Sequence, residues 1–140
     1  IDNVSKLLRG VIAILWGRCE EHDASKLLSP EKETFDKYTP LLHNLTYGSD
    51  EYKECLTGMK PALDHHYSVN NHHPEHYKEG VSGMNLIDVI EMLADWKAAS
   101  MRHADGNILK SLEINRKRFK ISDQFHYILF NTIERLGWAS

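Results

Sequence analysis

The sequence predicts an all-α protein, a single domain over residues 1–140 built from five to seven helices. Three observations predict this fold class. Apolar residues recur at the three- and four-residue spacing of amphipathic helices along most of the chain. Residues that favour helix starts stand just before several of these segments. No segment alternates apolar and polar residues in the way that a half-buried strand does.

The first half of the chain is expected to form three helices, over residues 3–20, 30–38 and 50–69. The first is predicted by apolar residues at helical spacing between Val4 and Leu15. The second has Ser29 as its N-cap and Pro30 at its first position. The third contains Pro61, which lacks a backbone N–H, so this helix is expected to bend or divide there.

The second half is expected to form a polar loop at 70–83 and then helices over 86–102, 108–119 and 122–136. Asn85 is a suitable N-cap for the helix at 86–102. Three acids of that helix, Asp88, Glu91 and Asp95, fall within about 60° of one another, and nearly all its other residues are apolar. Either these acids form a thin solvent-facing side, or Asp95 faces a polar pocket.

Composition excludes several classes of protein. The formal charge of −3 at pH 7 argues against a nucleic-acid-binding protein. No apolar run approaches the about 20 residues that cross a bilayer, so no membrane association is expected. Two cysteines do not make a disulfide framework, which predicts a cytoplasmic location. Histidine is enriched, with nine in 140 residues, and this enrichment is the first indication of a function.

Histidines and carboxylates gather in a pattern that suits a divalent transition metal. The candidate ligands are His22, Asp23, His65, His66 and Asp95. Neighbouring residues on a helix point about 100° apart. His22 and Asp23 can therefore share one ion only at a helix end or on a helix that passes close to it. The same holds for His65 and His66, of which only one need bind.

The string His22-Asp23-Ala24-Ser25-Lys26 with the later Asp95 resembles the HD-domain superfamily of metal-dependent phosphohydrolases. The chain is also similar, over residues 4–119, to an uncharacterised family of short bacterial and phage proteins. The shared motifs are this string, His65-His66, Asn70 with His72-His73, and Glu91 to Trp96. The resemblance implies a single HD-like helical bundle in the cytoplasm of a bacterium or of a phage-infected cell. Many HD proteins associate through helices, so a homodimer is compatible with it.

The reaction that this resemblance implies is hydrolysis of a phosphate ester in a nucleotide or a similar phosphorylated small molecule. One or two divalent ions, drawn from Mn, Fe, Co, Ni and Zn, would activate water. Lys26 and Glu31 are the candidate catalytic residues. Lys26 would meet the anionic substrate or pair with Asp23, and Glu31 would orient the attacking water or only cap its helix. The candidate substrate-binding residues are His72, His73, His76 and Arg102.

One departure from the HD pattern leaves the ligand set open. HD proteins supply a first histidine from the helix before the His-Asp pair, but no histidine lies between Ile1 and Glu21. Either a histidine directly before Ile1 completes the site, or His65 or His66 does. The alternatives to hydrolysis are a binuclear iron oxygenase of the HD type, a module that binds a nucleotide or a metal without catalysis, and a purely structural metal site.

Overall fold

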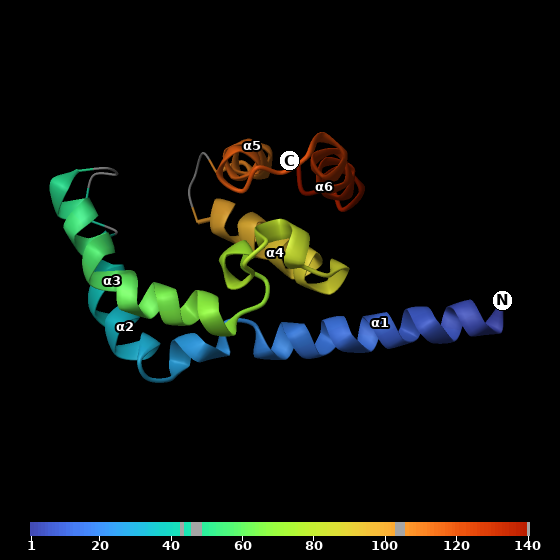
Figure 1. Ribbon diagram of the computed structural model, residues 1–140, viewed down its shortest axis with the longest axis horizontal. Helices are drawn as coiled ribbons and strands as arrows, with labels where there is room; N and C mark the ends of the chain where they lie inside the picture. The colour runs from blue at the N-terminus through green and yellow to red at the C-terminus, as the bar shows by residue number, and fades with distance from the viewer. Residues whose placement is uncertain (43, 46–48, 103–105, 140) are drawn as a thin grey trace.

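The computed structural model describes residues 1–42, 44–45, 49–102 and 106–139 (Figure 1). Within these ranges every regular element is helical, which confirms the predicted all-α class. The α-helices there are α1 (Asp2–Glu21), α2 (Glu31–Leu42), α3 (Asp50–Val69), α4 (Leu86–Ser100), α5 (Ile108–Arg118) and α6 (Asp123–Arg135). Short 3₁₀ helices between them are η1 (Ala24–Leu27), η2 (Pro74–His76) and η3 (Gly80–Gly83).

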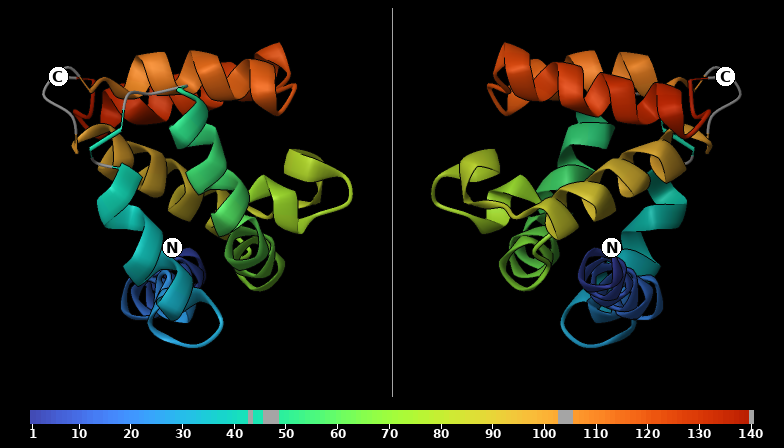
Figure 2. Two further views of the ribbon diagram at one scale, coloured as in Figure 1. Left: turned by 90° about the vertical axis from the view of Figure 1, so that its left-hand side faces the viewer. Right: turned by 90° about the vertical axis from the view of Figure 1, so that its right-hand side faces the viewer.

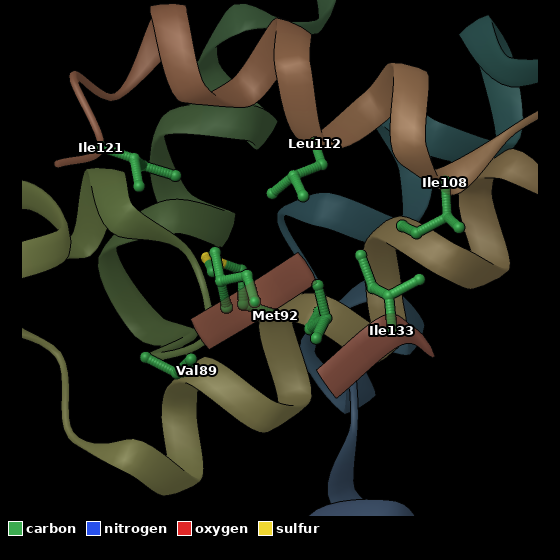
Figure 3. Packing of buried hydrophobic residues seen from close by; sticks show 8 residues of the cluster. Val89, Met92, Ile108, Leu112, Ile121 and Ile133 are labelled. Carbon is green, nitrogen blue, oxygen red and sulfur yellow. The ribbon is translucent and has the colours of Figure 1, made fainter. Parts of the chain in front are cut away.

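The hydrophobic core lies where α4 meets α5 and α6. Both views in Figure 2 show α5 and α6 side by side over α4. Met92 of α4, Leu112 of α5 and Ile133 of α6 belong to this core and are each at most 1% exposed (Figure 3). Full burial of such a side chain contributes about 1.5–3 kcal/mol to stability. This cluster therefore anchors α4, the helix that carries Glu91 and Asp95.

The predicted helix starts at Asn85 and Ser122 are present. The Asn85 side chain accepts hydrogen bonds from the backbone N–H groups of Ile87 and Asp88. Asp88 in return accepts from the Asn85 N–H at 3.2 Å, which completes a capping box. The Ser122 hydroxyl accepts from the Phe125 N–H at the start of α6. These bonds satisfy N–H groups that have no partner within the helix.

Of two proline-based expectations in the first half, one is met and one was wrong. α3 is one helix through Pro61 and is not divided there, and Figure 1 shows that it bends along its length, which is the other outcome expected of this proline. α2 begins at Glu31, one residue after Pro30, and continues past residue 38 to Leu42 with Pro40 inside it. α2 and α3 pack against each other along their lengths. We infer that this packing outweighs the backbone hydrogen bond lost at each proline, since tertiary contacts supply most of the stability of protein helices.

α1 lies against α4 through its C-terminal part, and its N-terminal end extends beyond the rest of the described chain (Figure 1). Leu15 and Arg18 are half-buried there, and no residue of α1 is fully buried. Neither α1 nor any other helix in the described ranges is long and apolar enough to cross a membrane.

Candidate metal centre

Four segments of the chain meet around one cluster of side chains. They are the end of α1 with His22 and Asp23, the end of α3, the loop that follows α3, and the middle of α4. α1 stops at Glu21, and Asp23 takes the left-handed conformation with φ of 56°. That conformation is uncommon outside glycine, asparagine and aspartate. Because the helix ends here, consecutive residues His22 and Asp23 both reach the same cluster, as the metal hypothesis requires.

The inner group of ligand atoms comes from Asp23, His66, His72 and His73. Asp23 Oδ1 lies 3.2 Å from His66 Nε2 and 3.4 Å from His72 Nε2. His66 Nε2 and His73 Nε2 are 2.9 Å apart. All four atoms lie within 4.8 Å of one another. Asp23 Oδ1 and His72 Nε2 are buried without a hydrogen-bond partner in the described structure.

These spacings fit one small cation. Ligand atoms at about 2.0–2.1 Å from a tetrahedral ion lie about 3.3 Å from each other. Three of the separations within the inner group are 2.9, 3.2 and 3.4 Å. A buried oxygen and a buried ring nitrogen without hydrogen bonds are costly unless something binds them. The donor set of three imidazoles and one carboxylate is one that divalent transition metals bind. The cluster could therefore hold a metal ion.

A second group adjoins the first through Asp23. His22 Nε2 lies 3.5 Å from Asp23 Oδ2 and 3.9 Å from Asp95 Oδ1. Asp95 therefore faces this polar cluster, although its side chain remains 22% exposed. The two oxygens of Asp23 lie toward the two groups, so the carboxylate stands between them. This geometry offers positions for one ion or for two.

Two glutamates contact the Nδ1 atoms of three imidazoles, on the side of each ring that faces away from the ligand groups. His66 Nδ1 donates to Glu31 Oε2 at 2.9 Å, and His22 Nδ1 donates to Glu91 Oε1 at 2.9 Å. His72 Nδ1 is 3.2 Å from the same Glu91 oxygen. A carboxylate at Nδ1 selects the tautomer whose Nε2 lone pair is free to bind a metal. Each of these three rings thus turns its free nitrogen toward the cluster.

Arg18 contacts the candidate site, although no sequence motif pointed to it. Its guanidinium donates to Asp88 Oδ1 at 2.7 Å and to Glu91 Oε2 at 2.8 Å. Asp88, which is fully buried, also accepts from the Tyr77 hydroxyl at 2.7 Å. Arg18 thereby fixes the end of α1 to α4 and orients Glu91. The signal that could have found it is its place as the one basic residue in the last turn of α1, one helical turn before His22.

Negative charge dominates the cluster. Its carboxylates belong to Asp23, Glu31, Asp88, Glu91 and Asp95, and its permanent cations are Arg18 and Lys26. Burial alone would raise the pKa of Glu91, but His22, His72 and Arg18 outweigh burial and lower it to about 2. Burial alone would likewise raise the pKa of Asp23, but His66, His72 and Lys26 hold it well below its usual range.

The imidazoles respond to this charge in opposite ways. Burial alone would lower the pKa of His72, but Asp23 and Glu91 raise it to about 9. Burial, together with the neighbouring His72 and His66, lowers the pKa of His73 to about 3. The cluster therefore lacks positive charge, which either a proton on His72 or a bound cation would balance.

Glu31 occupies a different place from the one expected of a water-orienting group. It is fully buried, and its oxygens accept from His65 Nδ1 at 2.7 Å, from His66 and from the Ser25 hydroxyl at 3.0 Å. Burial would raise its pKa, but the bonds from His65 and His66 lower it. Since both oxygens are engaged, Glu31 positions imidazoles and does not reach an open site.

Lys26 lies at the edge of the cluster, where its ammonium is 2.5 Å from Asp23 Oδ2. Its side chain is 37% exposed. Of the two expectations for this residue, the pairing with Asp23 is present. The exposed ammonium remains within reach of an anion that approaches the cluster.

Three further candidate residues lie outside the ligand groups, as Glu31 and Lys26 do. His65 is bound to Glu31 and does not join the groups, so only His66 of the pair faces the cluster. His76 donates from Nδ1 to the Tyr67 carbonyl at 3.0 Å, which ties η2 to α3. Arg102 is exposed in the turn after α4, about 10 Å along the helix axis from Asp95. No hydrogen bond or ion pair joins Arg102 to the cluster in the described part of the chain.

A histidine directly before Ile1, which was one of the two alternatives for completing the ligand set, would not fit this geometry within one chain. α1 is a continuous helix of 20 residues, which at 1.5 Å per residue is about 30 Å long. A residue directly before Ile1 would lie at the far end of this helix from His22. Of the two alternatives for completing the ligand set, the geometry favours His66.

The fold and this cluster define an all-helical protein with a candidate metal centre of histidines and carboxylates. The model of a family of unknown function, DUF5662, matches residues 1–135, so the chain belongs to that family. No curated protein and no solved structure gives a match to the chain.

Proposed function

We propose that the protein is a metal-dependent phosphohydrolase of the HD type that acts on a nucleotide or a similar phosphorylated small molecule. The observation that carries this proposal is the inner group of Asp23, His66, His72 and His73, with two buried atoms that lack a partner. We propose one or two divalent ions, drawn from Mn, Fe, Co, Ni and Zn, as the cofactor. The proximity of His22 and Asp23 to Asp95 supports the HD resemblance.

A divalent ion bound here would lower the pKa of a bound water and neutralise charge on a phosphoryl oxygen. The residues of the chain then have separate tasks. His22, Asp23, His66, His72, His73 and Asp95 are the candidate ligands. Glu31 and Glu91 keep three of the imidazoles in the tautomer that binds metal. Lys26, beside Asp23, supplies a cation for the phosphate group.

A groove next to the ligands supports a small-molecule substrate. It lies between the end of α1 and α4 and has a volume of about 530 Å³. That size is within the usual range for small-molecule sites, about 300–1,000 Å³. Its walls include Leu15, Ile90 and Ala94, and His22, Glu91 and Asp95 also line it. A substrate could place its non-phosphate part along the apolar walls and its phosphate at the ligands.

A binuclear iron oxygenase is the second candidate, because one specific observation favours a site for two ions. Asp23 stands between two adjoining groups, one with His66 and His72 and one with His22 and Asp95. Two ions that share Asp23 would suit either a binuclear hydrolase or an oxygenase. The identity of the bound metal separates them, because iron with an optical band indicates oxygen chemistry.

The test is to measure metal content by elemental mass spectrometry and phosphate release from a panel of nucleotides and phosphomonoesters. We expect one or two equivalents of a transition metal and metal-dependent phosphate release. His66→Ala should remove both, whereas His65→Ala, its neighbour outside the ligand groups, should keep bound metal. Metal without turnover, together with recovery of intact ligand, would point to a binding module. No metal after reconstitution would overturn the proposal.

A further inference from the structure

The N-terminal part of α1 presents apolar side chains that are not covered within the described chain. Leu7 is 72% exposed, Ile14 is 55% exposed and Val4 is 61% exposed. No residue of α1 is buried, and its N-terminal end stands clear of the other helices (Figure 1). Isolated helices are only marginally stable in water, and protein helices normally bury such an apolar side. Within the described ranges, no other element therefore covers this side of α1.

The residues on this side follow the alternating spacing of a helix-pairing seam. Leu7, Gly10, Ile14 and Gly17 are separated by three, four and three residues. Large and small residues alternate along the seam. A Cβ atom placed on Gly10 or on Gly17 would meet nothing within 4 Å. Glycine is unfavourable inside a helix, and the open space at these two positions lets a second helix approach closely.

A second copy of α1 fits this seam when it runs in the opposite direction. With a twofold axis near residue 12, Leu7 lies opposite Gly17 of the second copy, and Gly10 lies opposite its Ile14. Each large side chain then fills the space beside a glycine. A parallel pair would instead set Leu7 against Leu7 and Gly10 against Gly10, which leaves a void at each glycine. The antiparallel arrangement also opposes the two helix dipoles favourably.

The charges on α1 favour the same direction. Lys6 and Glu20 lie on one flank of the seam, fourteen residues apart, which is two heptads. In an antiparallel pair, Lys6 comes beside Glu20 of the second copy, and the twofold axis repeats this contact. Val11, which is 40% exposed, faces its own counterpart across the axis on the other flank. The surface is thus complementary to itself in shape and in charge, as an isologous interface requires.

From these observations we infer that α1 is a dimerisation helix, and that its Leu7–Gly17 seam pairs antiparallel with the same seam of a second copy of this chain. The inference does not depend on metal binding or on catalysis. It also places the N-terminal end of one α1 beside the end of the other, where His22 and Asp23 follow. A dimer would therefore bring a second chain to the edge of each candidate metal centre.

The mass of the protein in solution tests whether the pair forms. Sedimentation equilibrium over a range of concentrations should show a reversible dimer, with or without a chelator. The double variant Leu7→Glu, Ile14→Glu should be a monomer with unchanged helicity. Ile114→Glu, at a 66% exposed position on α5, is the matched control and should remain a dimer. A wild type that stays monomeric at all concentrations, or a double variant that still dimerises, would overturn the inference.

Cross-linking tests the direction of the pair. In a background with Cys19→Ser and Cys55→Ser, Val11→Cys should oxidise to a disulfide-linked dimer, whereas Ser5→Cys, on the opposite side of α1, should not. Lys6→Glu should weaken the dimer by about tenfold, and adding Glu20→Lys to it should restore the affinity. Equal cross-linking at both cysteines, or no restoration in the charge-reversed variant, would contradict the antiparallel seam.

Discussion

Glu31 Oε2 and His66 Nδ1 are 2.9 Å apart, and both side chains are almost completely buried. Glu31 stands at the start of α2, whereas His66 stands near the end of α3. This single contact therefore fixes the orientation of one ligand ring from a different helix. A second bond, from His65 to the other oxygen of Glu31, keeps the carboxylate itself in place.

Glu31→Gln should weaken metal binding by about 10- to 100-fold, the usual effect of losing a partner that orients a ligand. The amide keeps the size of the side chain but removes the charge that selects the tautomer of His66. Metal affinity is measured by competition with a chelating dye. Glu33→Gln, at an exposed position in the same turn of α2, should bind metal as the wild type does. Equal affinities in the two variants would reduce Glu31 to a structural role.

His72→Ala should lose bound metal, whereas His76→Ala should keep it. Both histidines belong to the segment between α3 and α4, but only His72 contributes to the ligand groups, and His76 is bonded to the Tyr67 carbonyl. Elemental analysis of the two purified proteins gives the result, and circular dichroism shows whether each retains its helices. If both variants keep a full metal content, the ion lies elsewhere in the protein.

Arg18→Ala should lower the free energy of unfolding by about 2 kcal/mol. Removing one partner of a fully buried ion pair costs about 3–5 kcal/mol, and the effect is smaller here because the Arg18 side chain is 28% exposed. Urea denaturation followed by circular dichroism measures the change. Arg9→Ala, an exposed position on the same helix, should change stability by less than about 0.5 kcal/mol. Similar losses of unfolding free energy in both variants would mean that the ion pairs of Arg18 with Asp88 and Glu91 do not stabilise the protein.

Removal of the metal should lower the melting temperature. An ion present at 100 times its dissociation constant adds about 2.7 kcal/mol to folding stability, which corresponds to about 8 °C for a protein of this size. Calorimetry with and without a chelator measures the shift. The chelator should have no effect on the melting of His66→Ala. A wild type that melts at one temperature in both conditions, although metal is bound, would argue against a site that forms only in the folded state.

Much of the secondary structure could be predicted because its signals are local. The apolar spacing from Val4 to Leu15 predicted α1, and Asn85 predicted the start of α4. The continuation of α2 through Pro40 was missed, because its stability comes from packing of α2 on α3, which spacing along the chain does not reveal. The sequence could not show whether the acids of α4 face solvent or a polar pocket. A helical wheel shows which residues share a face of the helix, but it does not show what covers that face.

The types of residue in the candidate site could be predicted from the sequence. Which individual residues belong to the site could be predicted less well. His22, Asp23 and Asp95 stood out by their resemblance to the HD pattern, and the structure brings them together. His65 and His66 are adjacent in sequence, and which of them faces the cluster depends on the rotation of α3 against α2. Arg18 and Glu91 carry no motif of their own that shows their pairing.

The amino-acid sequence therefore determines the approximate positions of most helices and which chemical groups are abundant, because apolar spacing and N-cap residues are local signals. The assembly of the cluster depends on contacts between distant segments. His22 and Glu91 are 69 residues apart along the chain, yet their side chains share a hydrogen bond of 2.9 Å. Burial of α4 against α5 and α6, and of α3 against α2, sets the positions from which these side chains meet. Which imidazoles face one another, and which atoms remain without a partner, follows from that packing.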